Sequence, residues 1–218
     1  TAPGDRRALD DEPMLFHTWV FLVFFAIAYP VHLLFRRTRY GTLWLLVTSY
    51  VFYGWWNPWY LLLLFGTAAI DYLMVVLMER SRTPRGRRLW LVVSLVSNFG
   101  FLGYFKYSGF LTDNLNALLA WAGLSLQLPD PIAYPNALLG LLGVPPAHQF
   151  AAVLLPLGIS FHTFQSMSYT IDAYFGRIPM ERSLVRFLAF VSFFPQLVAG
   201  PIERAGNLLP QLGRAPRV

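Results

Sequence analysis

The residues best suited to chemistry lie in one apolar segment in the last third of the chain. At about 100° per residue, five polar side chains in this segment fall within an arc of about 120° on one helix face. They are His162, Gln165, Ser166, Tyr169 and Asp172. In a membrane-spanning helix such a face turns toward the bundle interior or a water-filled cavity, because lipid solvates it poorly. The spacing therefore predicts either the lining of a substrate channel or a set of interhelical hydrogen bonds.

Two further places combine charge with apolar sequence. Glu203 and Arg204 follow Gly200-Pro201, and a broken helix at membrane depth is tolerated only where it is buried in protein or meets water. We interpret Pro201, Glu203 and Arg204 as a cavity wall, with a plain helix end and a surface ion pair as the alternative. Asp71 lies inside an apolar run, where a lone carboxylate is costly. Hydrogen bonds from neighbouring helices, or else a catalytic role, would account for it.

The sequence lacks the local motifs of common soluble enzymes. It has no glycine-rich phosphate loop, no Gly-x-Ser-x-Gly elbow and no His-Glu-x-x-His. The histidines at 17, 32, 148 and 162 are never three or four residues apart, so we expect no local metal site. Since cysteine is absent, a disulfide and a cysteine nucleophile are excluded. We therefore assign no catalytic residue and no bound cofactor.

Composition identifies the environment that must hold these residues. The chain has 218 residues, of which 56% are hydrophobic and only 13% are charged. A soluble domain usually carries about 25% charged residues, so this chain lacks the polar surface to cover itself in water. The net charge of +6 comes from arginine clusters between apolar runs, which is the positive-inside pattern of membrane proteins. Nucleic acid is therefore not an expected partner.

The order of apolar and polar segments predicts an all-α, polytopic membrane helical bundle with five to six spans. The predicted spans are residues 15–35, 42–56, 61–78, 89–105 and 151–175, with 184–199 as a sixth span or a re-entrant element. Residues 107–127 form an amphipathic stretch, and 128–149 are predicted to be a proline-rich loop. Because the positive loops alternate with loops that lack Lys and Arg, the N-terminus is expected outside.

Residues 1–13 are charged and contain Pro and Gly, which predicts a disordered tail or leader ahead of Met14. The first apolar run could also be a signal peptide. The acidic residues Asp10, Asp11 and Glu12 before it argue against that reading, because a signal peptide begins with positive charge.

Four motifs, in order along the chain, resemble the membrane-bound O-acyltransferase family and most closely its alginate O-acetyltransferase branch. They are Ser-Tyr-Val-Phe-Tyr-Gly-Trp-Trp at 49–56, Leu-Gly-Tyr-Phe-Lys-Tyr at 102–107, the segment 155–174 with its polar stripe, and Phe-Pro-Gln-Leu-Val-Ala-Gly-Pro-Ile at 194–202. The resemblance implies a helical bundle with a funnel in the bacterial inner membrane. It also implies an acyl donor such as acetyl-CoA on the cytoplasmic side, an exported polysaccharide as the acceptor and a periplasmic partner protein.

The family's catalytic histidine lies in a Trp-His-Gly-type motif, and no Trp-His pair occurs here. We therefore expect residues 14–218 to be the N-terminal part of an acyltransferase domain that ends before the catalytic histidine and is inactive alone. The alternative is a non-catalytic membrane scaffold, or a channel or transporter component, complete at this length.

Overall fold

The computed structural model describes residue 16 and residues 18–38, 40–55, 57–145, 158–197, 200 and 203–213. Over these residues every regular element is a helix, which confirms the all-α prediction. The predictions for residues 1–13, His17, His148 and Pro201 lie outside the described residues.

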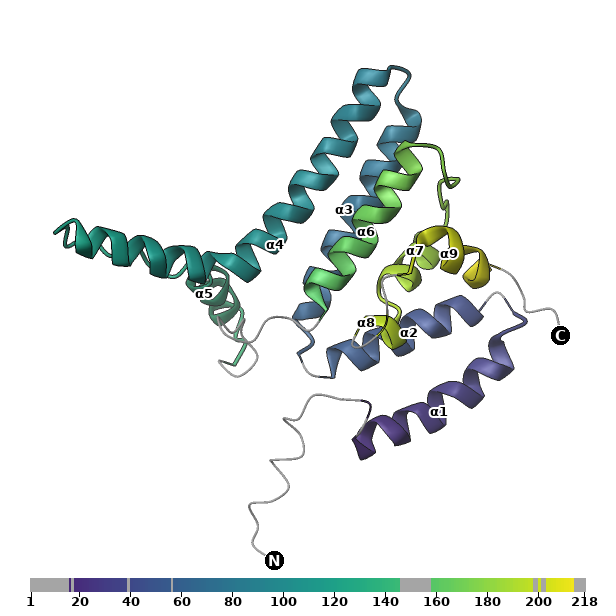
Figure 1. Ribbon diagram of the computed structural model, residues 1–218. Helices are drawn as coiled ribbons and strands as arrows, with labels where there is room; N and C mark the ends of the chain where they lie inside the picture. Colours follow the sequence, from purple (N-terminus) through teal and green to yellow (C-terminus); the bar gives the residue numbers. More distant parts are fainter. Residues whose placement is uncertain are drawn as a thin grey trace, which may run out of the picture.

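Helices α1 (Trp19–Phe35) and α2 (Gly41–Gly54) pack against each other at one side of the molecule (Figure 1). The Thr18 hydroxyl caps α1 by accepting a hydrogen bond from the Phe21 amide, since the first amides of a helix lack partners within it. The Trp44 indole of α2 donates to the carbonyl of Ala28 in α1 at 3.0 Å. This bond and the packing of Phe52 near Phe21 join the two helices.

Helices α3 (Tyr60–Arg80), α4 (Pro84–Trp121) and α6 (Ile159–Tyr174) contact one another and run side by side in Figure 1. A short turn joins α3 to α4, where Thr83 caps the new helix and Pro84 occupies its first turn. The predicted span 89–105 and the amphipathic stretch 107–127 are not separate, since α4 continues unbroken from Pro84 to Trp121. Figure 1 shows that α4 bends partway along, so its last part leaves the bundle.

The loop predicted at 128–149 contains helix α5 (Ala133–Leu141), so that prediction was wrong for these residues. The prolines that suggested a loop stand at the start of this helix. Pro131 precedes it and Pro135 lies in its first turn, where a missing amide proton breaks no helical hydrogen bond.

The apolar run 184–199 is interrupted in the structure. It forms α7 (Leu184–Val191) and the one-turn helix α8 (Phe194–Leu197), and α9 (Ala205–Gly213) follows. An eight-residue helix measures about 12 Å, less than half the thickness of a bilayer core. The reading of 184–199 as a straight sixth span was therefore wrong, while a broken, protein-covered element agrees with the structure.

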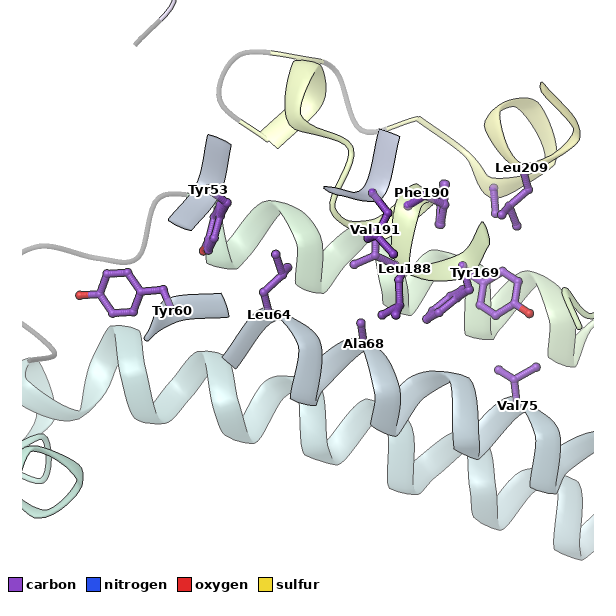
Figure 2. Close-up of a cluster of buried hydrophobic side chains, with 14 of the residues drawn as sticks. Tyr53, Tyr60, Leu64, Ala68, Val75, Tyr169, Leu188, Phe190, Val191 and Leu209 are labelled. Atoms are coloured by element: carbon purple, nitrogen blue, oxygen red, sulfur yellow. The ribbon is translucent and has the colours of Figure 1, made fainter. Parts of the chain in front are cut away.

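The core surrounds α7. Phe187, Phe190 and Val191 on this helix are fully buried among side chains of α2, α3, α6 and α9. Figure 2 shows this cluster, with Leu188 and Val191 facing Leu64 and Ala68 of α3. The core thus holds α6 and its polar face in one position.

Two described helices, α3 and α4, are long and apolar enough to cross a membrane. Helix α1 and the segment 184–196 are apolar but shorter. Many large apolar side chains of α1, α3 and α4 are exposed, as expected of a surface that faces lipid rather than water.

Candidate functional site

Asp71 is the centre of a buried polar cluster between three helices. Its side chain on α3 is fully buried, and Oδ1 accepts hydrogen bonds from Ser94 Oγ at 2.5 Å and Asn98 Nδ2 at 2.6 Å, both on α4. Its other oxygen, Oδ2, accepts a hydrogen bond from Ser166 Oγ on α6. The interpretation that neighbouring helices donate hydrogen bonds to Asp71 is therefore confirmed.

This cluster brings one residue of the polar stripe into contact with residues that the sequence analysis missed. Ser94 and Asn98 stand four apart, so both side chains lie on the same face of α4. The spacing of two buried-type polar residues within an apolar run was the available signal. It is weak, because single serines and asparagines are common in membrane helices.

His162, one turn ahead of Ser166 on α6, is also buried. Its Nε2 lies 3.4 Å from Thr67 Oγ1 on α3. Because the Thr67 hydroxyl donates to the Leu63 carbonyl at 2.9 Å, Nε2 is the donor toward Thr67. The other ring nitrogen, Nδ1, is then an acceptor, and it has no hydrogen-bond partner among the described residues. The stripe therefore presents one free proton-accepting nitrogen inside the protein.

Gln165 lies beside His162 and connects α6 to the broken segment. Its Nε2 donates to the Phe190 carbonyl at 2.8 Å and to Gln196 Oε1 at 3.2 Å. Its Oε1 is buried with no partner in the described part of the chain. The amide thus holds α7 and α8 against the stripe while leaving one acceptor open.

Tyr169 and Asp172 form the end of the stripe nearest the C-terminus of α6. The Tyr169 hydroxyl accepts a hydrogen bond from the Glu181 amide at 3.0 Å, and its ring packs on Phe187. Asp172 forms a 3.1 Å ion pair with Arg177, whose side chain is 63% exposed. These two residues therefore secure the connection that leaves α6.

A hollow of about 200 Å³ opens near this same end of α6. Its wall is Val75, Met78 and Glu79 of α3, Arg87 of α4, Ala173 of α6, and Ile178 and Met180 beyond it. No stripe residue belongs to this wall. The prediction that the stripe lines a substrate channel stays a prediction, and the contacts described above are interhelical.

Glu203 and Arg204 lie at the start of α9. Glu203 Oε2 accepts a hydrogen bond from Asn207 Nδ2 at 3.2 Å, and Arg204 is exposed. Neither the cavity-wall reading nor the surface reading is decided by these contacts.

Comparison with known proteins supplies the identity. The chain is 36% identical over 200 residues to the probable alginate O-acetylase AlgI of Pseudomonas aeruginosa, an alignment that covers 91% of this chain and 34% of the relative. The AlgI protein of Azotobacter vinelandii is also 36% identical, with 91% of this chain and 36% of the relative covered. The chain is homologous to the alginate O-acetylases. The resemblance to membrane-bound O-acyltransferases of this branch is confirmed.

A peptidoglycan O-acetyltransferase of Helicobacter pylori is 31% identical over 200 residues, covering 81% of this chain and 33% of that protein. The chain spans about a third of the length of the curated relatives it matches. No family model and no solved structure match it. The homologues named here are acetyltransferases, so acyl transfer is the activity to which the alginate O-acetylase homology points.

Proposed function

We propose that this chain is the N-terminal part of an integral-membrane O-acyltransferase that moves an acetyl group from a cytoplasmic donor to an exported polysaccharide. The observation that carries the proposal is its 36% identity, over 91% of its length, to alginate O-acetylases. The donor is acetyl-CoA or a similar acyl carrier. The acceptor is an alginate-like or peptidoglycan-like polymer, because relatives named for both are homologous to the chain.

In this proposal the chain is a multi-pass protein of the bacterial inner membrane with five to six spans and its N-terminus outside. The apolarity of α3 and α4 supports the membrane setting. Five arginines between residues 80 and 88 support a cytoplasmic position for the turn that joins these two helices.

Within the intact enzyme the polar stripe forms one wall of the funnel, and a histidine contributed from beyond these residues acts as general base on the acceptor hydroxyl. His162 and Gln165 support the funnel assignment, since each retains a buried acceptor atom without a partner among the described residues. We also propose that Pro201, Glu203 and Arg204 form part of the cavity wall. A periplasmic partner protein completes the transfer to the polymer, and the chain alone is inactive.

The test is complementation of a strain that makes the polymer but lacks its acetylase. The complete gene that contains this sequence should restore ester-linked acetyl groups, measured on the purified polymer by proton NMR. The 218-residue chain produced alone should restore none at equal abundance in the membrane. Acetylation by the chain alone would contradict the proposed inactivity. Failure of the complete gene with both candidate polymers, despite normal membrane abundance, would favour a non-catalytic scaffold.

A further inference from the structure

The last part of α4 and helix α5 form an extension that the proposed function does not use. We call residues 107–142 the arm. Two hydrogen bonds fold its connecting segment back along α4, from Tyr104 Oη to the Pro131 carbonyl at 2.5 Å and from Asn116 Nδ2 to the Leu128 carbonyl at 3.0 Å. Figure 1 shows the arm leaving the bundle formed by α3, α4 and α6.

The arm exposes large apolar side chains on one side. Viewed down the helix, five of them fall within an arc of about 100°, and Asp113 lies well outside that arc. They are Tyr107, Phe110, Leu111, Leu118 and Trp121. Trp121 is 88% exposed, and Leu141 of α5 is 85% exposed. An apolar face of this size requires a partner that shields it from water.

The length of α4 determines where this face lies. Residues 84–105 measure about 33 Å, enough to cross the hydrocarbon core from the arginine-rich turn. Residues 107–121 add only about 22 Å, which is too short for a second crossing. Because the helix bends as it leaves the bundle, the arm begins at the opposite surface of the bilayer.

The composition of the arm indicates which partner covers it. Residues 107–142 contain no Lys or Arg, and their acidic residues are Asp113 and Asp130. Attraction to an acidic partner is therefore excluded. Aromatic side chains with a polar edge (Tyr107, Trp121 and Tyr134) are exposed along the arm, and such side chains favour the boundary between headgroups and acyl chains.

We infer that the arm lies flat in the membrane interface on the side opposite the arginine-rich turn, with its apolar face in the acyl-chain boundary. It anchors the bundle and fixes the depth of the end of α4. The expected depth is about 5–10 Å below the headgroups, as for other interfacial helices. The inference rests on the membrane setting of the proposed function.

The test uses the absence of native cysteine. The full 218-residue chain is reconstituted in vesicles of phosphatidylethanolamine and phosphatidylglycerol, with one bimane-labelled cysteine at a time. Leu118→Cys and Leu111→Cys report on the apolar face of the arm, and Asp113→Cys is the matched control on the other side. Leu73→Cys, on the exposed surface of mid-α3, reports on the membrane span.

We expect labels at 118 and 111 to be quenched most by lipids brominated near the headgroup, and the label at 113 to be quenched by aqueous iodide. The label at 73 should be quenched most by lipids brominated near the chain ends. If 118 and 111 respond to iodide as 113 does, the arm stands in water and the inference is wrong. If neither lipid nor iodide quenches them, protein covers the arm and the inference is equally wrong.

In both of those cases, lipid quenching at 73 would leave the membrane setting and the proposed function intact. Iodide quenching at 73 would instead show that α3 is outside the bilayer. That result would overturn the membrane setting, and the placement of the arm with it.

Discussion

Asp71 joins three helices through one carboxylate. Ser94 and Asn98 on α4 and Ser166 on α6 all donate to it, and no cation lies within ion-pair distance in the described part of the chain. Three donors thus do the work that a positive charge often does for a buried acid. The arrangement fixes the rotation of α4 and α6 relative to α3.

We therefore expect Asp71→Ala to destabilise the protein. Each donor left without an acceptor costs about 1–3 kcal/mol when buried, so the melting temperature in detergent should fall clearly. Asp113→Asn, an exposed acid on α4, is the control and should change stability by less than about 0.5 kcal/mol. An unchanged melting temperature for Asp71→Ala would contradict the assigned role.

His162 gives a second prediction at the same scale, which separates channel lining from helix packing. Its hydrogen bond to Thr67 is long, at 3.4 Å, so its loss should cost little stability. If the free Nδ1 faces the funnel, His162→Leu in the intact enzyme should lower polymer acetylation about tenfold, or about 1.4 kcal/mol of barrier, at normal abundance. Thr67→Val removes only the partner and should keep full activity. Unchanged acetylation with His162→Leu would leave the stripe as packing.

At the scale of elements, the start of α6 depends on one backbone conformation. Gly158 precedes α6 with φ 81°, in the left-handed region that side chains with a Cβ disfavour. This turn sets the direction in which α6 enters the bundle, and so the face on which His162 and Ser166 lie.

Gly158→Ala should therefore destabilise the protein by about 1–2 kcal/mol. Gly100→Ala is the matched control, because a Cβ there meets no atom within 4 Å and alanine favours the helix. Melting temperatures in detergent should fall for the first variant and hold or rise for the second. Equal shifts for both would show that α6 does not need this turn.

For the whole molecule, charge predicts orientation. The arginine-rich turn between α3 and α4 should lie in the cytoplasm, and the connection between α4 and α5, which lacks Lys and Arg, should lie outside. Since the chain has no cysteine, single cysteines can report this without interference.

Gln127→Cys should react with a membrane-impermeant maleimide in intact spheroplasts, and Arg82→Cys only after permeabilisation. Both positions are exposed, so accessibility reflects the side of the membrane rather than burial. The reverse pattern would invert the proposed topology, and labelling of both from outside would place them on the same side.

The sequence alone determined the helical class, the inward-facing stripe of α6 and the homology to O-acetylases. These follow from local patterns, since helical spacing and short motifs are written in neighbouring residues. It did not determine what the stripe touches. The partners of Asp71 lie 23, 27 and 95 positions away, and only tertiary packing brings them together.

The tertiary structure also decided the lengths of two elements. Apolarity alone made residues 184–199 look like a span, but the chain breaks after Val191 because α7 is surrounded by four other helices. Polar residues made 107–127 look separate from the preceding span, yet α4 continues to Trp121, since the hydrogen bonds of a helix form equally well in lipid and at its surface. Pattern assigns a residue to a helix face, and packing decides what that face meets.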